Sequence, residues 1–126
     1  MKPMTTILVC LLLAASALPV AAQDVDSTSG EVLSNCSVPT RPEIPNGRNA
    51  TEEEMLEAQR MLKTYLADGD SFINCLEGLE TKWGASESDE QRAVIVIFHN
   101  RMVDEMQSTG DLFNQAVRAF KGKRGS

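Results

Sequence analysis

The chain has 126 residues, among them 12 Lys and Arg, 18 Asp and Glu, one His and three Cys, so its formal net charge is -6. This length allows one small domain, and the negative charge argues against a nucleic-acid-binding protein. The sequence lacks a phosphate-binding loop and a dinucleotide glycine pattern, and it has few of the side chains that metallohydrolases and thiol oxidoreductases need. We therefore expect a protein that is not an enzyme and that uses no cofactor.

Residues 1 to 22 have the pattern of a signal peptide. Lys2 gives a positive start, residues 7 to 18 form a dense apolar stretch, and small residues precede the expected cleavage after Ala22. A membrane-spanning helix needs about 20 apolar residues, whereas this stretch is shorter and is followed by Pro19. We therefore expect a periplasmic or secreted protein without stable membrane insertion.

Cys36 and Cys75 are the two cysteines that remain after this cleavage. In an exported chain such a pair is far more often a disulfide than a metal site or a catalytic dithiol. A bridge that closes a loop of about 40 residues contributes roughly 4 kcal/mol in the chain-entropy model. The sequence thus predicts a Cys36–Cys75 disulfide that supplies much of the stability of a small domain.

The segment between the signal and the first helix divides into two parts. Residues 23 to 35 are rich in Asp, Ser, Thr and Gly, which predicts a disordered leader. Residues 36 to 50, which we call the strap, contain Pro39, Pro42 and Pro45 at every third position, and this spacing is typical of an extended polyproline II segment. The strap is either a ligand for a proline-binding domain or a rigid arm tied down by Cys36. We favour the arm, because proline-binding domains are mostly cytoplasmic.

Residues 51 to 83 have the pattern of one long amphipathic helix. Thr51 and Glu54 form a capping box at its start. Apolar or small residues then recur at spacings of three and four, which indicates a helix that packs against another helix. These positions are Met55, Ala58, Leu62, Tyr65, Gly69, Phe72, Leu76, Leu79 and Trp83. At Gly69 we expect a kink or a close approach of the second helix.

A second helix is predicted from Asp89 to about Phe120, after a break at residues 84 to 88 in which Gly84 ends the first helix and Ser88 with Gln91 caps the second. Its core positions are Ile95, Phe98, Met102, Met106, Thr109, Phe113, Ala116 and Phe120. Residues 94 to 98 also suit a β-strand, but the helical spacing continues past them and no partner strand is available. Residues 121 to 126 are left as a basic tail. The short break predicts an all-α fold, a long antiparallel hairpin over residues 51 to 120.

The apolar faces of the two helices are wider than one hairpin interface requires. The surplus residues are Leu56, Leu66, Ile73, Val94, Ile97 and Leu112. The strap can cover part of this surface, and a second copy of the hairpin can cover the rest by forming a four-helix bundle. We therefore expect a protein that presents an amphipathic helical surface for self-association, as a homodimer, or for binding another protein.

A spaced set of motifs runs through the chain after the signal: Cys36-Ser-Val-Pro39, Pro42-Glu-Ile-Pro45-Asn-Gly47, Ala50-Thr51, Glu54-Met55, Tyr65, Cys75-Leu76 and residues 114 to 120. This set resembles a family of small, uncharacterised, exported bacterial proteins. The resemblance covers most of the chain that follows the signal. It implies a periplasmic or secreted helical protein and brings no catalytic residue or ligand with it.

Two groups of side chains are candidate ion sites. His99, Met102 and Met106 share one helical face, and thioether and imidazole ligands suit a soft copper ion in an exported carrier. The simpler interpretation is that both methionines fill the core, so we predict no metal site there. The carboxylates of Asp68 with Asp70, and of residues 52 to 54, are interpreted as solvated charge rather than as a calcium or acid–base site.

Overall fold

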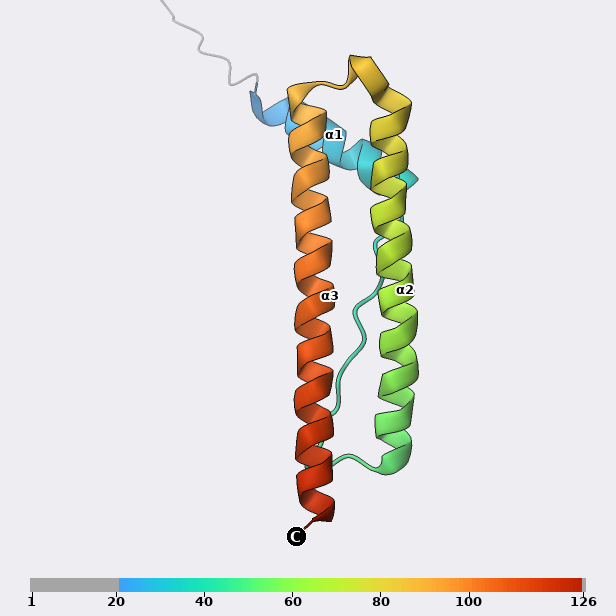
Figure 1. Ribbon diagram of the computed structural model, residues 1–126. Helices are drawn as coiled ribbons and strands as arrows, with labels where there is room; N and C mark the ends of the chain where they lie inside the picture. Colours follow the sequence, from blue (N-terminus) through green and yellow to red (C-terminus); the bar gives the residue numbers. More distant parts are fainter. Residues whose placement is uncertain (1–20, 126) are drawn as a thin grey trace, which may run out of the picture.

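The computed structural model describes residues 21 to 125, and all regular structure in this part of the chain is helical. The elements are α1 (Ala21–Asn35), α2 (Glu52–Trp83), a short 3-10 turn η1 (Gly84–Ser86) and α3 (Asp89–Arg124). The long helices α2 and α3 lie side by side and antiparallel, and α1 crosses them near the end that carries η1 (Figure 1). The predicted helical hairpin is therefore confirmed.

Local hydrogen bonds at the predicted positions set the ends of α2. The Glu54 backbone N–H donates to Thr51 Oγ1 at 3.1 Å, and the Thr51 N–H donates to Glu54 Oε2 at 2.7 Å, which confirms the capping box. Gly84 ends the helix with a φ of 54°, a conformation that glycine adopts without the steric cost of a Cβ atom.

Helix α3 begins as predicted but is longer than predicted. Ser88 and Gln91 form the second capping box, and residues 94 to 98 are helical rather than a strand. The prediction of a tail over residues 121 to 126 is wrong for residues 121 to 124, because α3 continues to Arg124. Lys123 stabilises this last turn, since its Nζ donates to the Ala50 carbonyl at 2.7 Å and lies 4.9 Å from the centre of the Phe120 ring.

The core lies along the interface of the two long helices. Every predicted core position of α2 is buried except Trp83, which is half-buried. The buried residues of α3 are Val94, Ile95, Met102, Thr109 and Ala116. The four other predicted positions of α3, Phe98, Met106, Phe113 and Phe120, are half-buried because two helices alone cannot enclose such large side chains. At Gly69 the close approach is confirmed, since a Cβ atom there would lie 2.6 Å from Met106 Sδ.

Residues 23 to 35 are helical, which corrects the expectation of a disordered leader. Val32 is fully buried in the core, and Glu31 Oε1 accepts a hydrogen bond from Trp83 Nε1 at 3.3 Å. The few apolar residues of this segment thus suffice to dock a helix, because the hairpin supplies the other half of the contact. The predicted signal segment lies outside the described residues except for positions 21 and 22, the first two residues of α1.

The predicted disulfide between Cys36 and Cys75 is present and links the end of α1 to the C-terminal half of α2, with the two Cα atoms 5.7 Å apart. From there the strap runs along the hairpin to the start of α2 (Figure 1). It passes 23 helical residues, or about 35 Å, with only 15 residues of its own, so its backbone must be extended. Pro42 and Gly47 of the strap are buried, and a Cβ atom at Gly47 would overlap the backbone carbonyl of Ala116.

Candidate functional site

The hairpin has two broad sides, and among residues 21 to 125 the segments that cover it, α1 and the strap, lie on one of them. Helix α1 and the strap both lie behind α2 and α3 in Figure 1. We call this side the covered face. Its contacts include the core contact of Val32 and a hydrogen bond from Arg41 Nη2 to Ser108 Oγ at 3.3 Å. It also contains a mostly apolar hollow of about 250 Å³, lined by Leu33, Val38, Phe72, Phe98, Arg101, Met102 and Glu105.

The opposite side carries a groove between α2 and α3 to which neither α1 nor the strap contributes. Near the C-terminus of α3 its lining residues are Glu52, Met55, Leu56, Gln59, Phe113, Asn114, Val117, Phe120 and Arg124. Seven-residue spacing continues this lining along both helices, from Gln59 to Leu66 and Ile73 and from Phe113 back to Met106. We call the apolar residues Leu56, Leu66, Ile73, Met106, Phe113 and Val117 the open groove.

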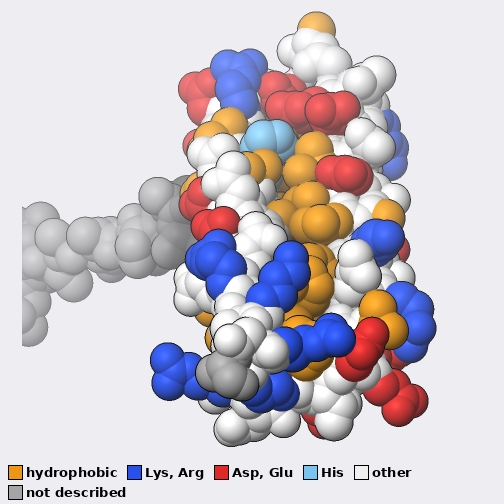
Figure 2. Space-filling model, turned by 60° about the horizontal axis from the view of Figure 1, so that its bottom comes forward, with side chains coloured by type: hydrophobic (Ala, Val, Ile, Leu, Met, Phe, Trp, Pro, Cys, Tyr) orange, Lys and Arg blue, Asp and Glu red, His pale blue; other side chains and the backbone are white. Residues whose placement is uncertain are grey.

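The open groove is visible as a band of hydrophobic side chains with charged side chains on both sides (Figure 2). Leu56 is 50% exposed, and the other members are half-buried. Of the surplus residues predicted from the sequence, Leu56, Leu66 and Ile73 belong to this groove. Val94 is buried in the core cluster that also holds Val32, Leu112 lines a hollow beside the strap, and Ile97 is 61% exposed. The surplus apolar residues expected from the sequence are therefore divided between the two sides of the hairpin.

Charge is unevenly distributed along the hairpin. The last turns of α3 carry Arg118, Lys121, Lys123 and Arg124 without an acidic residue among them. The half of the hairpin that leads to η1, from residue 68 to residue 91, carries one basic residue, Lys82, and the acidic residues Asp68, Asp70, Glu77, Glu80, Glu87, Asp89 and Glu90. A cluster of Lys and Arg side chains lies at the near end of the apolar band in Figure 2. The start of α2 brings Glu52, Glu53 and Glu54 to the same end as these basic residues, and Arg124 Nη1 lies 4.0 Å from Glu52 Oε2, so this end carries charges of both signs.

The two methionines of the candidate copper site lie between the helices. Met102 is buried in the main core cluster, and the Met106 side chain packs against Gly69 of α2. His99 is half-buried, and its Nδ1 lies 3.4 Å from Asn100 Oδ1. Both thioethers would have to leave apolar contacts to bind an ion. Across residues 21 to 125, no three His, Cys, Asp or Glu side chains gather in a group that suits a metal ion.

The candidate carboxylate clusters are on the surface. Asp68 and Asp70 are exposed, as are Glu52, Glu53 and Glu54. Glu54 accepts the hydrogen bond of the capping box, so its carboxylate has a structural role at the start of α2.

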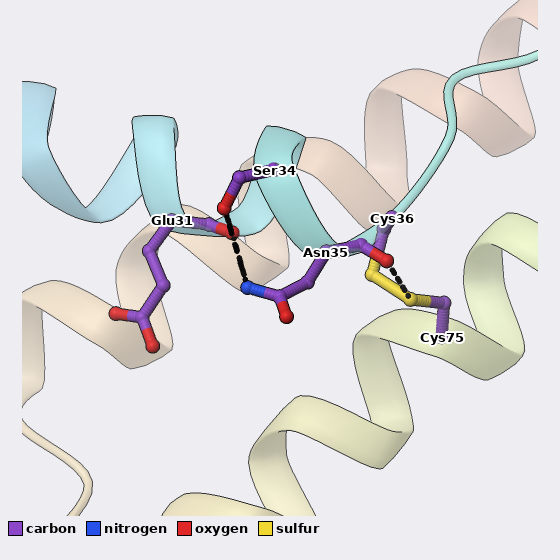
Figure 3. The surroundings of a disulfide bond; sticks show 5 residues. All are labelled: Glu31, Ser34, Asn35, Cys36 and Cys75. Carbon is purple, nitrogen blue, oxygen red and sulfur yellow. Dashed lines mark hydrogen bonds between the residues drawn. A yellow bond between two sulfur atoms is a disulfide. The ribbon is translucent and has the colours of Figure 1, made fainter.

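The disulfide lies where α1 ends and the strap begins, directly against α2 (Figure 3). Cys36 is buried, and Cys75 Sγ lies 3.5 Å from the Asn35 carbonyl oxygen. The last turn of α1 is held locally as well, because Ser34 Oγ and Asn35 Nδ2 both donate to the Glu31 carbonyl at 2.8 Å. This single bond therefore anchors both elements that cover the hairpin.

Tyr65 is the most unusual polar group of the described core. The residue is 2% exposed, and its hydroxyl makes no hydrogen bond of ordinary geometry; the neighbouring Thr109 hydroxyl donates to the Glu105 carbonyl at 2.7 Å. Burial raises the pKa of Tyr65, and the nearby Glu105 carboxylate raises it further, while the Thr109 side chain and Arg41 act in the opposite direction. The folded environment thus favours the neutral phenol up to a higher pH than in a free tyrosine.

The sequence interpretation missed helix α1 and the buried position of Gly47. The signal for α1 was the spacing of Val32 and Cys36, which are four residues apart and thus share one side of a helix. The signal for Gly47 was its place in an Asn-Gly turn, where a missing side chain also permits close packing of backbones. Both features became clear only once the hairpin surface beside them was known.

Comparisons of this chain with models of protein families, with curated proteins and with solved structures find no match. The resemblance to exported bacterial proteins therefore stays a prediction. Among the described residues, no helix has the length and apolar content needed to cross a membrane.

Proposed function

We propose that this chain is an exported, non-catalytic protein whose open groove binds a helix, either from a second copy of itself or from another protein. The observation that carries this proposal is the one-sided covering of the hairpin. Leu56 of α2 and Phe113 of α3 line a groove to which neither α1 nor the strap contributes a lining residue. Leu66, Ile73 and Met106, which continue this lining at seven-residue spacing, are only partly buried against the core. An amphipathic helix that lays its apolar side into such a groove removes this surface from water.

The charges beside the groove support a protein partner. A continuous apolar strip with a charged border has the anatomy of a protein–protein interface, in which an apolar centre supplies affinity and a polar rim supplies specificity. The groove is long and shallow rather than enclosed, which suits a helix better than a small molecule.

The disulfide supports the export part of the proposal. Such bonds form and persist in oxidising compartments, and this one holds both elements of the covered face. Export with cleavage after Ala22 gives a mature chain that begins at Gln23. N-terminal sequencing of the protein recovered from the periplasm or the culture medium should give this start. A chain retained in the cytoplasm with residues 1 to 22 intact would contradict export.

A site-specific photo-crosslinker tests the groove in living cells. We expect a crosslinker at Leu66 to form protein adducts, because this position lies within the open groove. The matched control is the same crosslinker at Ile97, which is 61% exposed but is not part of the groove. Adducts at both positions, or at neither, would contradict the proposed function, whereas adducts at position 66 alone support it whatever protein they contain.

A further inference from the structure

The apolar hollow of the covered face lies where α1 crosses the hairpin and the strap turns away along it (Figure 1). Leu33 of α1 and Val38 of the strap line this hollow, and each is 51% exposed. The Cys36–Cys75 bond holds both residues in place, because Cys36 lies between them in the chain. A molecule in the hollow would remove from water the apolar surface that these two side chains expose.

The hairpin contributes aromatic rings and a sulfur atom to the lining of the hollow. Phe72 of α2 and Phe98 of α3 pack edge to face, with ring centres 6.2 Å apart and an angle of 67° between the rings. Met102 of α3 completes this part of the lining and belongs to the same core cluster as Phe72. Aromatic rings and thioether sulfur both make favourable contacts with a further aromatic ring. The lining therefore favours an aromatic ligand over an aliphatic one.

The two charged residues that line the hollow pair with each other. Arg101 Nε donates to Glu105 Oε1 at 3.0 Å, one turn further along α3. A charged ligand would have to break this pair or give up its hydration against apolar side chains, whereas a neutral ligand would do neither. The lining therefore favours a ligand without net charge.

We propose that this hollow is a binding site for a small, neutral aromatic molecule. Its volume is about 250 Å³. An engineered apolar cavity of about 150 Å³ binds benzene, and drug-sized ligands occupy pockets of about 300 Å³ or more. A single ring with a short substituent lies between these sizes. The site is separate from the open groove, so this inference does not rest on the proposed function.

NMR titration of the oxidised protein with para-fluorotoluene tests the proposal. We expect saturable binding, with nuclear Overhauser contacts between the ring protons of the probe and the methyl groups of Leu33 and Val38. The charged probes para-fluorobenzoate and para-fluorobenzylammonium should bind at least about tenfold more weakly, because the hollow offers no unpaired charge to either of them. Methylcyclohexane, which has a similar size but no aromatic ring, should bind about threefold more weakly than para-fluorotoluene.

A pair of double variants locates the binding site. Leu33→Ala with Val38→Ala should weaken the binding of para-fluorotoluene about tenfold, because it removes apolar contacts from the lining. Both side chains are half-exposed, so the variant should keep the helix content of the wild type by circular dichroism. The matched control is Val96→Ala with Ile97→Ala, which shortens side chains that are 49% and 61% exposed but do not line the hollow. It should bind the probe as tightly as the wild type.

Several results would overturn the proposal. The absence of saturable binding up to the solubility limit of para-fluorotoluene would show that the hollow takes no aromatic ring. Equal weakening by the two double variants, or Overhauser contacts only with residues of the open groove, would place the probe outside the hollow. Charged probes or methylcyclohexane that bind as tightly as para-fluorotoluene would refute the proposed class of ligand.

Discussion

The covered face of the hairpin and the opposite side, which carries the open groove, have the same spacing of apolar residues, but they differ in how far those residues are buried. On the covered side, α1 and the strap lie over the helices, and Tyr65 and Phe72 are 2% and 3% exposed. On the open side, Leu66 and Phe113 remain half-buried and Leu56 is 50% exposed. The helical spacing of apolar residues is the same on both sides of the hairpin. The difference in burial therefore comes from the position at which the strap is attached to α2.

The comparison shows that covering a hairpin needs a tether as well as apolar contacts. The strap contributes few large apolar side chains of its own, among which Ile44 packs beside Ala50 and Met55. Its position depends on two fixed ends, the Cys36–Cys75 bond and the capped start of α2. Releasing the strap at either fixed end should therefore expose apolar side chains of the covered face, as they are exposed in the open groove.

The largest effect is expected from Cys36→Ser. Loss of the bond frees a loop with a sequence separation of 39 and should lower the free energy of unfolding by about 4 kcal/mol. Denaturant unfolding should show this loss, together with increased binding of an apolar dye as Phe72 and Phe98 become exposed. Identical unfolding midpoints for the variant and the oxidised protein would show that the tether is dispensable.

Gly47→Ala should loosen the strap at its other end. A Cβ atom would lie 2.7 Å from the Ala116 carbonyl carbon and 3.0 Å from the Phe120 nitrogen, and these are backbone atoms that cannot rotate away. We expect a loss of about 2 kcal/mol in thermal or denaturant unfolding. Gly78→Ala is the matched control, because nothing lies within 4 Å of its Cβ position and alanine favours a helix by about 1 kcal/mol. A Gly47→Ala chain as stable as the wild type would mean that the strap does not pack against α3.

The helix caps lie outside both sides of the hairpin. Their loss should lower the free energy of unfolding without exposing apolar side chains. Thr51→Ala and Ser88→Ala each remove a hydrogen bond of 3.1 Å to a backbone N–H and should each cost about 1 kcal/mol. Calorimetric melts would measure this cost, and dye binding by the folded proteins should stay at the wild-type level. Increased dye binding by Thr51→Ala would show that the start of α2 also holds the strap in place.

Tyr65→Phe should have the smallest effect at neutral pH, since the hydroxyl has no hydrogen bond to lose. The folded state raises the pKa of Tyr65 above the ordinary tyrosine value of about 10. Above that pH the unfolded chain releases the phenol proton while the folded chain keeps it, so wild-type stability should fall as the pH rises. The Phe variant should lose this part of the alkaline decrease.

Ultraviolet absorbance offers a direct test, because the chain has a single tyrosine. The phenolate signal of the folded protein should appear at a higher pH than that of the protein in denaturant. Coincident titration curves would show that the phenol is not enclosed beneath the strap.

Much of the fold could be predicted because its signals are local or periodic. The pairs Thr51 with Glu54 and Ser88 with Gln91 set the helix starts through hydrogen bonds within one turn. The spacing of three and four identified every buried residue of α2. The disulfide followed from a count of cysteines, since only two remain after the predicted signal.

Helix α1 and the extension of α3 could not be predicted in the same way. Residues 23 to 35 have too few apolar side chains to form a stable helix alone, and Val32 gains its burial from a surface made by residues distant in the sequence. The last turn of α3 likewise depends on Lys123 reaching the carbonyl of Ala50, 73 positions away.

The sequence by itself thus determined the two long helices, the caps at their starts, the buried stripe of α2 and the disulfide, because each depends on residues within a few turns or on a single possible pairing. Only the tertiary structure decided which apolar face α1 and the strap cover and which face remains as the open groove. The physical reason is that burial of apolar surface is equally favourable on either side of the hairpin. The choice between them is made by the path of the tethered strap from Cys75 to Thr51.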